Sequence, residues 1–320
     1  MIPMVEQNRN DPTMLAIRVH AFGGTEAMIR ESINRPQPGP GQVLLRVEAA
    51  GVGPWDAWVR SGRSKLPQPL PLTLGADLCG TVEKLGAGVT EFKRGAVVFG
   101  ITNSRFTGAY AEYALAEVDG IAAKPRRLTV AEAASIPVVA CTAWQMVFDH
   151  GRVDADKTVL VQGAAGNVGA YAVQLAKRAG ARVFATAAND DMDYVFELGA
   201  DEVIDANGPP LVLLSDSIDV VLDTAGGSSL ERSFDALKQG GVLVSCVAPP
   251  DPDEVARRGV RAVFFLVEVN RTGLEQLGRL FDAGELKTHV GEVLPLRDAA
   301  LAHEMLAGRA HKPGKIVLLP

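Results

Sequence analysis

Cysteine is scarce in this sequence. Only three occur among 320 residues, Cys79, Cys141 and Cys246, and each lies in an apolar stretch far from the others. Three cysteines cannot form a disulfide framework, and no pair has the short spacing of a zinc site. We therefore expect three small buried side chains in a reducing compartment, which predicts a cytoplasmic location.

Long apolar runs and an excess of positive charge are also absent. No stretch of 18 or more consecutive apolar residues exists, so a membrane-spanning helix is not expected. The formal net charge of −6 provides no basic surface for nucleic acid or for an anionic membrane. The first dozen residues lack the apolar core of a secretory signal. These absences favour a small molecule as the partner.

The length of 320 residues predicts two domains. Residues 14–125 contain short alternating strands that are separated by glycine and proline, most clearly at 43–49, 80–86 and 96–100. Short strands at this spacing predict a β-rich barrel or sandwich for the first part of the chain.

Helical stretches and apolar runs alternate after residue 128. The runs are 158–161, 182–186, 219–223, 241–245 and 262–266, with helices expected at 168–178 and 230–238. This rhythm predicts a doubly wound parallel sheet with helices on both faces, an α/β fold. A last helix is expected at about 274–283. The tail strand at 314–319 has no helix after it and is a candidate to return to the first domain.

A glycine-rich turn follows the apolar run at 158–162 and opens a helix. Its glycines are Gly163, Gly166 and Gly169, and Ala165 stands where the second glycine of the usual Gly-x-Gly-x-x-Gly pattern lies. Glycines here let the backbone approach a pyrophosphate, and the helix N-terminus offers free N–H groups to the phosphates. The strand before the turn and the amphipathic helix after it supply the required context, so we predict a dinucleotide site.

The end of the next strand decides how the adenosine ribose is recognised. An acidic residue there would bind the 2′-hydroxyl group and repel a 2′-phosphate, but the chain has Ala187 at this place. Asp190 and Asp191 follow closely, and no Arg or Lys is near in the sequence. From these residues alone, the choice between NAD and NADP stays open.

In combination and order, the motifs of this chain resemble the quinone oxidoreductase branch of the medium-chain dehydrogenase/reductase superfamily. The resemblance covers nearly the whole chain after residue 14. Besides the glycine-rich turn, it rests on 50–56, 60–62, 74–77, 86–89 with Gly95, 108–113, 142–144, 198–201, 223–227 and 314–318.

The resemblance implies a particular domain organisation. A GroES-like, β-rich catalytic domain would span residues 1–128 and be completed by 284–320, with the Rossmann dinucleotide-binding domain at 129–283 inserted. Nicotinamide and substrate would meet in a cleft between the two domains.

The resemblance also implies which residues form the site. Thr142 would contact the nicotinamide end, and Thr186 with Ala187 would face the adenosine ribose. Thr224, Phe264 and Leu266 would line the cofactor groove. The pyrophosphate would be held by Gly163, Ala164, Ala165, Gly166, Asn167, Val168 and Gly169. Gly53, Trp55, Asp56 and Phe265 are candidates for the substrate pocket. No catalytic residue is identified, because water could supply any proton that is needed.

Zinc is not expected, because its ligands are missing. Where zinc-dependent relatives have a Cys and a His, this chain has Gly53 and Ala76, and the second Cys would lie near Val138. Of the potential ligands only Asp77 is present, and a catalytic zinc needs about three protein ligands. The four-cysteine structural lobe is absent as well. The sequence therefore predicts a site without metal.

Without a metal, the carbonyl of an unactivated aldehyde is not polarised. We therefore predict hydride transfer from NAD(P)H to an acceptor that is already electron-poor, either a quinone or an α,β-unsaturated carbonyl compound. Two alternatives stay open. The chain could be an enoyl or alkenal reductase with a narrow substrate, or a non-catalytic dinucleotide-binding redox sensor.

Three departures from the family pattern bear on specificity. Gly53 replaces an Asn, which removes an amide from the active cleft and puts the substrate in doubt. Asp190 replaces a basic residue and Ala206 a Tyr, and both changes weaken the family's preference for NADP(H). NADP(H) is still favoured over NAD(H). The apolar run 260–267 is expected to be the last strand of its sheet, an edge through which the chain would form a homodimer.

Overall fold

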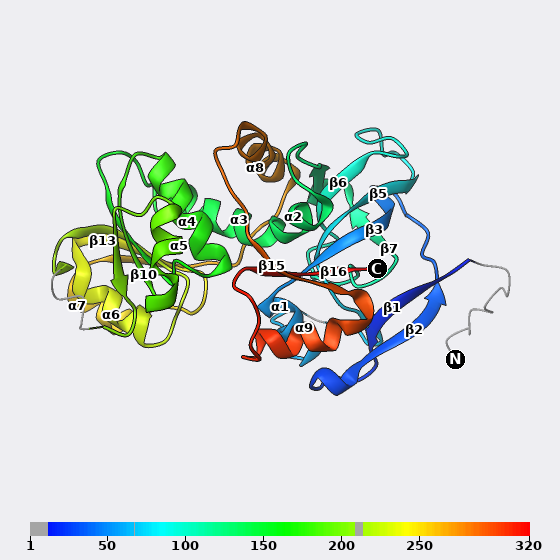
Figure 1. Cartoon of the computed structure of the whole chain (residues 1–320), viewed down its shortest axis with the longest axis horizontal. Helices are drawn as coiled ribbons and strands as arrows, with labels where there is room; N and C mark the ends of the chain where they lie inside the picture. Colours follow the sequence, from blue (N-terminus) through cyan, green and yellow to red (C-terminus); the bar gives the residue numbers. More distant parts are fainter. Residues whose placement is uncertain (1–11, 67, 209–213) are drawn as a thin grey trace. The chain divides into compact units, whose positions relative to one another are not determined.

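The computed structural model describes residues 12–66, 68–208 and 214–320. The chain divides into two compact units (Figure 1). Unit 1 comprises Met1–Pro137, Val269–Gly278 and Thr288–Pro320, and unit 2 comprises Val138–Glu268 and Arg279–Lys287. Helix α8 (Arg271–Ala283) contributes residues to both units.

Unit 1 contains two β-sheets. The larger has the order β15-β16-β3-β5-β6-β8 with β7 paired to β3, and the smaller has the order β2-β1-β4. The strands are β1 (Thr13–Val19), β2 (Met28–Asn34), β3 (Gln42–Val52), β4 (Leu72–Thr73), β5 (Asp77–Leu85), β6 (Val97–Ile101), β7 (Tyr113–Glu117), β8 (Ile121–Ala123), β15 (Val290–Pro295) and β16 (Lys315–Leu319). The helices are α1 (Pro54–Arg60), α2 (Val130–Ser135) and α9 (Ala299–Leu306).

The C-terminal strand β16 returns to the sheet of unit 1, as the sequence indicated. It pairs antiparallel with β3, where Ile316 lies opposite Val52 and Leu318 opposite Ala50. Because β3 also pairs with β5 and β7, the C-terminal strand and strands from residues 42–117 are joined in one sheet.

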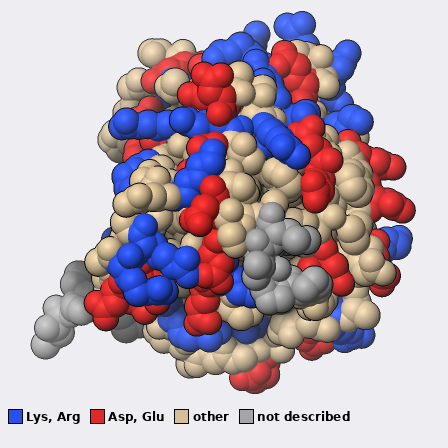
Figure 2. Space-filling view, turned by 90° about the vertical axis from the view of Figure 1, so that its left-hand side faces the viewer, with Lys and Arg blue, Asp and Glu red and all other residues tan. Residues whose placement is uncertain are grey.

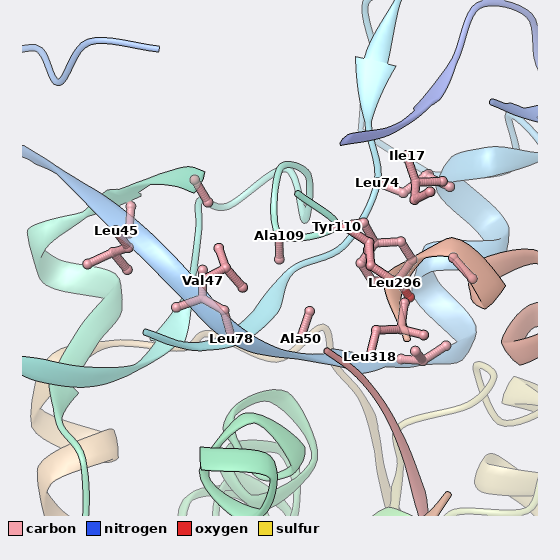
Figure 3. Close-up of a cluster of buried hydrophobic side chains, with 14 of the residues drawn as sticks. Ile17, Leu45, Val47, Ala50, Leu74, Leu78, Ala109, Tyr110, Leu296 and Leu318 are labelled. Atoms are coloured by element: carbon pink, nitrogen blue, oxygen red, sulfur yellow. The ribbon is translucent and has the colours of Figure 1, made fainter. Parts of the chain in front are cut away.

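Alternating side chains of these strands form the core of unit 1. Leu45 and Val47 of β3 and Leu78 of β5 are at most 4% exposed. Figure 3 shows them in one cluster with Tyr110, whose ring is completely buried. Burial of these apolar groups stabilises the unit by roughly 1.5–3 kcal/mol for each large side chain.

Unit 2 is built on a six-stranded parallel sheet with the order β11-β10-β9-β12-β13-β14. Its strands are β9 (Thr158–Gln162), β10 (Arg182–Ala187), β11 (Glu202–Asp205), β12 (Ile218–Asp223), β13 (Leu237–Ser245) and β14 (Arg261–Phe264). Helix α3 (Pro137–Trp144) precedes the first of these strands. The connections between strands contain α4 (Asn167–Arg178), α5 (Met192–Glu197), α6 (Ser228–Ala236) and α7 (Pro252–Arg258). The prediction of a Rossmann-type doubly wound sheet with a second, β-rich part is confirmed.

Two element boundaries in unit 2 differ from the expectation. Helix α6 ends at Ala236, because Leu237 already pairs with Ile218 at the start of β13. Strand β14 ends at Phe264, which pairs with Ser245, so Phe265 and Leu266 lie beyond the strand.

On the face seen in Figure 2, Lys and Arg are interspersed with Asp and Glu. None of the helices in the described residues is long and apolar enough to cross a membrane.

Candidate functional site

The glycine-rich turn after β9 is held in place by backbone contacts. Gly163 has a left-handed backbone with φ of 72°, and its N–H donates to Thr186 Oγ1 at 3.2 Å. The next N–H, of Ala164, donates to the Thr186 carbonyl at 2.9 Å. The end of β10 therefore fixes the path of the turn, and glycine meets the φ requirement without strain.

Helix α4 starts directly from this turn. Gly166 is its N-cap, no side chain caps the helix, and the first helical hydrogen bond runs from Ala170 N to Gly166 O at 2.9 Å. The first N–H groups of the helix are thus available to an anion, and the helix dipole favours negative charge there.

Gly169 allows the helix to pack closely on the turn. A Cβ atom at this residue would lie 2.2 Å from the Gly163 carbonyl oxygen and 2.8 Å from Ala164 Cα. At Gly166 the closest atom would be 3.2 Å away. The residues of the turn therefore fit the pyrophosphate of a dinucleotide, and Gly169 is the position that tolerates no side chain.

Three polar residues, Gln162, Thr186 and Thr224, stabilise the same turn. Thr186 Oγ1 donates to Gln162 Oε1 at 2.7 Å, and Thr224 Oγ1 donates to the Gln162 carbonyl at 2.7 Å. Both hydroxyl groups are therefore engaged inside the protein. Thr186 and Thr224, which sequence reasoning assigned to the ribose and the groove, help to shape the turn.

The guanidinium of Arg232 reaches the C-terminal ends of β10 and β11, where the ribose is predicted to bind. Ala206 N donates to the Ala187 carbonyl at 2.8 Å, and Arg232 Nη2 donates to the Ala206 carbonyl at 3.2 Å. Arg232 belongs to α6, far along the chain, which is why sequence reasoning found no cation here. Asp190 and Asp191 lie in the exposed 3-10 helix Asn189–Asp191.

The predicted cofactor residues Thr142, Phe264 and Leu266, and the predicted substrate-pocket residue Phe265, lie in other parts of unit 2. Thr142 is buried in α3, and its hydroxyl donates to the Val138 carbonyl at 2.7 Å. Phe264 ends β14, and Phe265 packs on His150 with ring centroids 4.5 Å apart. Leu266 is 63% exposed, the most exposed of the large apolar side chains that the structure describes.

In unit 1, the indole of Trp55 lies over Gly53. A Cβ atom at Gly53 would be 2.2 Å from Cζ2 of this ring, so a larger residue would require the ring to move. Phe106 meets the ring edge-on at 6.2 Å. Gly53 and the Trp55 ring thus pack against each other at the start of α1.

Asp56 is buried and holds that start in place. Its Oδ2 accepts from Gly53 N at 2.8 Å and from the Tyr110 hydroxyl at 3.1 Å. Burial raises the pKa of Asp56 to about 7, the Gly53 N–H opposes this shift, and the negative charge of Asp77 adds to it. The sequence predicts Asp56 in the substrate pocket; in the structure its carboxylate accepts from Gly53 N, at the start of its own helix, and from the Tyr110 hydroxyl.

His303 of α9 completes this cluster from the C-terminal part of the chain. Its Nε2 lies 3.4 Å from the Tyr110 hydroxyl, and the two rings meet edge-on at 5.9 Å. Burial lowers the pKa of His303 to about 3, helped by the nearby Arg60 charge. Both ionisable partners of Tyr110 are therefore kept neutral over the weakly acidic pH range.

Lys315 and Asp77 form a buried ion pair in the same unit. Lys315 Nζ lies 3.1 Å from Asp77 Oδ2, and the two side chains are 2% and 0% exposed. The ammonium also lies 4.3 Å from the centre of the Trp55 ring, a cation–π contact.

The donor set at this place does not suit a zinc ion. Gly53 and Ala76 carry no ligand atom, and the Asp77 carboxylate already binds a cation. Within residues 12–66, 68–208 and 214–320, no group of three or more His, Cys, Asp or Glu side chains could hold a metal ion.

Comparisons with known proteins agree with this architecture. Residues 39–126 match the family profile described as alcohol dehydrogenase GroES-like domain, and residues 198–318 match the one described as zinc-binding dehydrogenase. Quinone oxidoreductase of Sus scrofa is 33% identical over 324 residues, which cover 96% of this chain and 98% of that protein.

Solved structures give the same result. The quinone oxidoreductase from Coxiella burnetii has a TM-score of 0.88 at 31% identity, covering 97% of this chain and all of that one. A cobalt- and zinc-bound thermostable alcohol dehydrogenase from Pyrobaculum aerophilum has a TM-score of 0.85 at 30% identity, with 97% and 100% coverage. Proteins with and without metal in their descriptions therefore share this fold, and the site residues must distinguish them.

Proposed function

This chain belongs to the quinone oxidoreductase branch of the medium-chain dehydrogenase/reductase superfamily and is an oxidoreductase, and from this premise we propose the reaction that it catalyses. It transfers a hydride from NAD(P)H to a quinone or to an α,β-unsaturated carbonyl compound, without a metal ion. NADP(H) is the proposed cofactor, in preference to NAD(H).

One observation carries the choice of acceptor. The Trp55 ring fills the space beside Gly53, and the carboxylate of Asp77 is paired with the Lys315 ammonium. Neither residue 53 nor residue 76 can ligate a metal that would polarise an unactivated carbonyl. An acceptor that is electron-poor by itself needs no such polarisation, and quinones and conjugated carbonyl compounds meet this condition.

The residues of unit 2 provide binding and orientation. The N-terminus of α4 and the turn at Gly163 would hold the pyrophosphate, and Gly169 keeps the helix close enough for this contact. When bound, a reduced nicotinamide supplies the hydride. The protein's contribution is to fix the reactants in place, which replaces a metal or an acid as the source of rate enhancement.

The proposal is tested by a paired titration with NADPH and NADH, followed by turnover with a panel of quinones, enones and enals. We expect turnover of quinones or enones at a rate that depends on the reduced dinucleotide. Binding of dinucleotide without turnover of any acceptor would favour the redox-sensor alternative. Turnover restricted to one enoyl or alkenal substrate would favour the narrow reductase.

A further inference from the structure

We propose that Arg232 binds the 2′-phosphate of NADP(H) and is the residue that makes this chain prefer it over NAD(H). The inference rests on the dinucleotide site proposed above. It assigns to α6 a role that the residues following β10 do not fill, because Asp190 and Asp191 are acidic.

The position of Arg232 follows from two hydrogen bonds in series. The Ala187 carbonyl, at the last residue of β10, accepts from Ala206 N, and the Ala206 carbonyl accepts from Arg232 Nη2. The end of β10 is where a Rossmann fold recognises the adenosine ribose. A guanidinium is thus linked to the ribose-recognition edge through one intervening residue.

A second contact fixes the direction of the side chain. Arg232 Nε donates to the carbonyl of Ser228, one turn earlier in α6, at 3.3 Å. These two carbonyl contacts orient the plane of the guanidinium but do not neutralise its charge. Three further N–H groups of the fork are left for other acceptors.

Arg232 is half-buried, and within the described residues it forms no ion pair with a carboxylate. Most arginines of unit 2 that take part in ion pairs, such as Arg178 and Arg257, pair with a glutamate. A partly desolvated guanidinium without a counter-charge is suited to an anionic ligand, and its planar fork matches a phosphate in bidentate geometry.

Acidic groups on the neighbouring elements oppose the ligand. Asp190 and Asp191 follow β10, and Asp205 ends β11, where its carboxylate accepts from Asn207 N at 2.9 Å. An anion at this edge therefore depends on Arg232 for compensation. Loss of the positive charge should affect the 2′-phosphate far more than the ribose hydroxyl.

The test measures the binding of NADPH and of NADH to Arg232→Gln, with nicotinamide fluorescence as the signal. Glutamine can still donate to a carbonyl but carries no charge. We expect the Kd for NADPH to rise by about 10- to 100-fold, the usual effect of one charge-assisted contact, and the Kd for NADH to change by less than about twofold. Arg232→Lys should recover part of the loss, since it restores the charge without the fork.

Two controls separate this role from a structural one. Arg257→Gln removes an exposed arginine of α7 that pairs with Glu254, and it should leave both Kd values unchanged. Displacement of NADPH by adenosine 2′,5′-bisphosphate should weaken in Arg232→Gln, whereas displacement by 5′-AMP should not.

Equal weakening of both dinucleotides, or no change in either, would overturn the inference. If the native protein binds NADH but not NADPH, the inference fails while the dinucleotide site stands. If it binds neither, the proposed function itself fails.

Discussion

Unit 2 forms the turn at Gly163, the proposed phosphate site, largely from backbone groups, whereas unit 1 places charged side chains in its interior. Around Gly163 and Gly169 the contacts are backbone N–H and carbonyl groups and the neutral hydroxyls of Thr186 and Thr224. Ion pairs such as Lys177–Asp201 lie at the surface, 43% and 35% exposed. In unit 1 the Lys315–Asp77 pair is almost completely buried. Unit 2 is therefore sensitive to where the backbone can pass, and unit 1 to which charges it encloses.

The turn offers the strongest test of this contrast. In Gly169→Val, a branched side chain would meet the Gly163 carbonyl, since even a Cβ atom would be 2.2 Å from it. Helix α4 must then move away from the turn, and we expect dinucleotide affinity to fall by about 100-fold or more, roughly 3 kcal/mol. Titration with NADPH measures the loss.

Gly166→Ala is the matched control. Its Cβ would be 3.2 Å from the same oxygen, and its φ of −72° suits any residue, so affinity should change by less than about tenfold. Circular dichroism must show both variants folded. Unchanged affinity in folded Gly169→Val would mean that the dinucleotide binds elsewhere.

The turn was predictable because its signal is local. Strand, glycines and helix lie within 158–178, and their spacing alone predicts the strand, turn and helix that the structure has there. The alternating strands of unit 1 and the return of β16 were also predictable. Apolar and polar residues alternate in those strands, and the tail strand has no helix after it.

The buried clusters of unit 1 were not predictable, because they join distant residues. Tyr110 lies 54 positions from Asp56 and 193 from His303, and Lys315 lies 238 from Asp77. No spacing rule connects such positions. Arg232 was missed for the same reason, since only the packing of α6 brings it to Ala206.

A pair of lysine variants sharpens the contrast between buried and surface charge. Lys315→Met leaves the Asp77 carboxylate buried without its cation, and we expect unfolding free energy to fall by about 3–5 kcal/mol. Lys177→Met removes the exposed partner of Asp201 and should cost at most about 1 kcal/mol. Urea denaturation measures both. Similar losses in the two variants would contradict the distinction between the units.

The double variant Lys315→Met/Asp77→Leu serves as a control for the buried pair. Removing both charges together should recover much of the loss, because no buried charge is then left without compensation.

The Asp56–Tyr110–His303 cluster predicts a specific pH dependence of stability. Burial raises the pKa of Asp56 from its ordinary value of 3.8 to about 7, and burial lowers the pKa of His303 from 6.5 to about 3. Between about pH 4 and 6.5, unfolding releases a proton from Asp56 and binds one at His303. The two contributions cancel, so this cluster adds no slope to the native protein's stability in that range.

Single substitutions uncover each contribution. In His303→Gln only Asp56 titrates, so stability should fall as pH rises from about 4 to 7, by roughly 4 kcal/mol in total. In Asp56→Asn only His303 titrates, and stability should fall as pH drops below 6.5, by about 1.4 kcal/mol per pH unit. Urea titrations across this range measure both slopes relative to the native protein. Slopes of the same sign in the two variants would refute the pairing.

The edge of the unit 2 sheet leads to the prediction of a homodimer. Strand β14 pairs only with β13 in the described structure, so its outer side is open for a second copy of the chain. Light scattering at micromolar concentration should give twice the mass of 33.8 kDa. Val263→Lys should shift the mass toward that of one chain, because lysine on an edge strand disfavours pairing. A monomeric native protein would rule out this arrangement.

The smallest effect is expected from the removal of metal ions, which concerns the residues around Asp77 in unit 1. The Asp77 carboxylate has Lys315 as its cation, and Gly53 and Ala76 supply no ligand, so removal of metal ions should leave turnover unchanged. Activity with a quinone is measured before and after dialysis against a strong chelator, with elemental analysis of the same samples. A zinc-dependent alcohol dehydrogenase treated in parallel should lose its activity, which shows that the chelation was effective. Stoichiometric zinc that leaves this protein together with its activity would mean that ligands other than residues 53 and 76 complete a metal site. The buried ammonium of Lys315 would then be a neighbour of that site rather than the reason that no metal is needed.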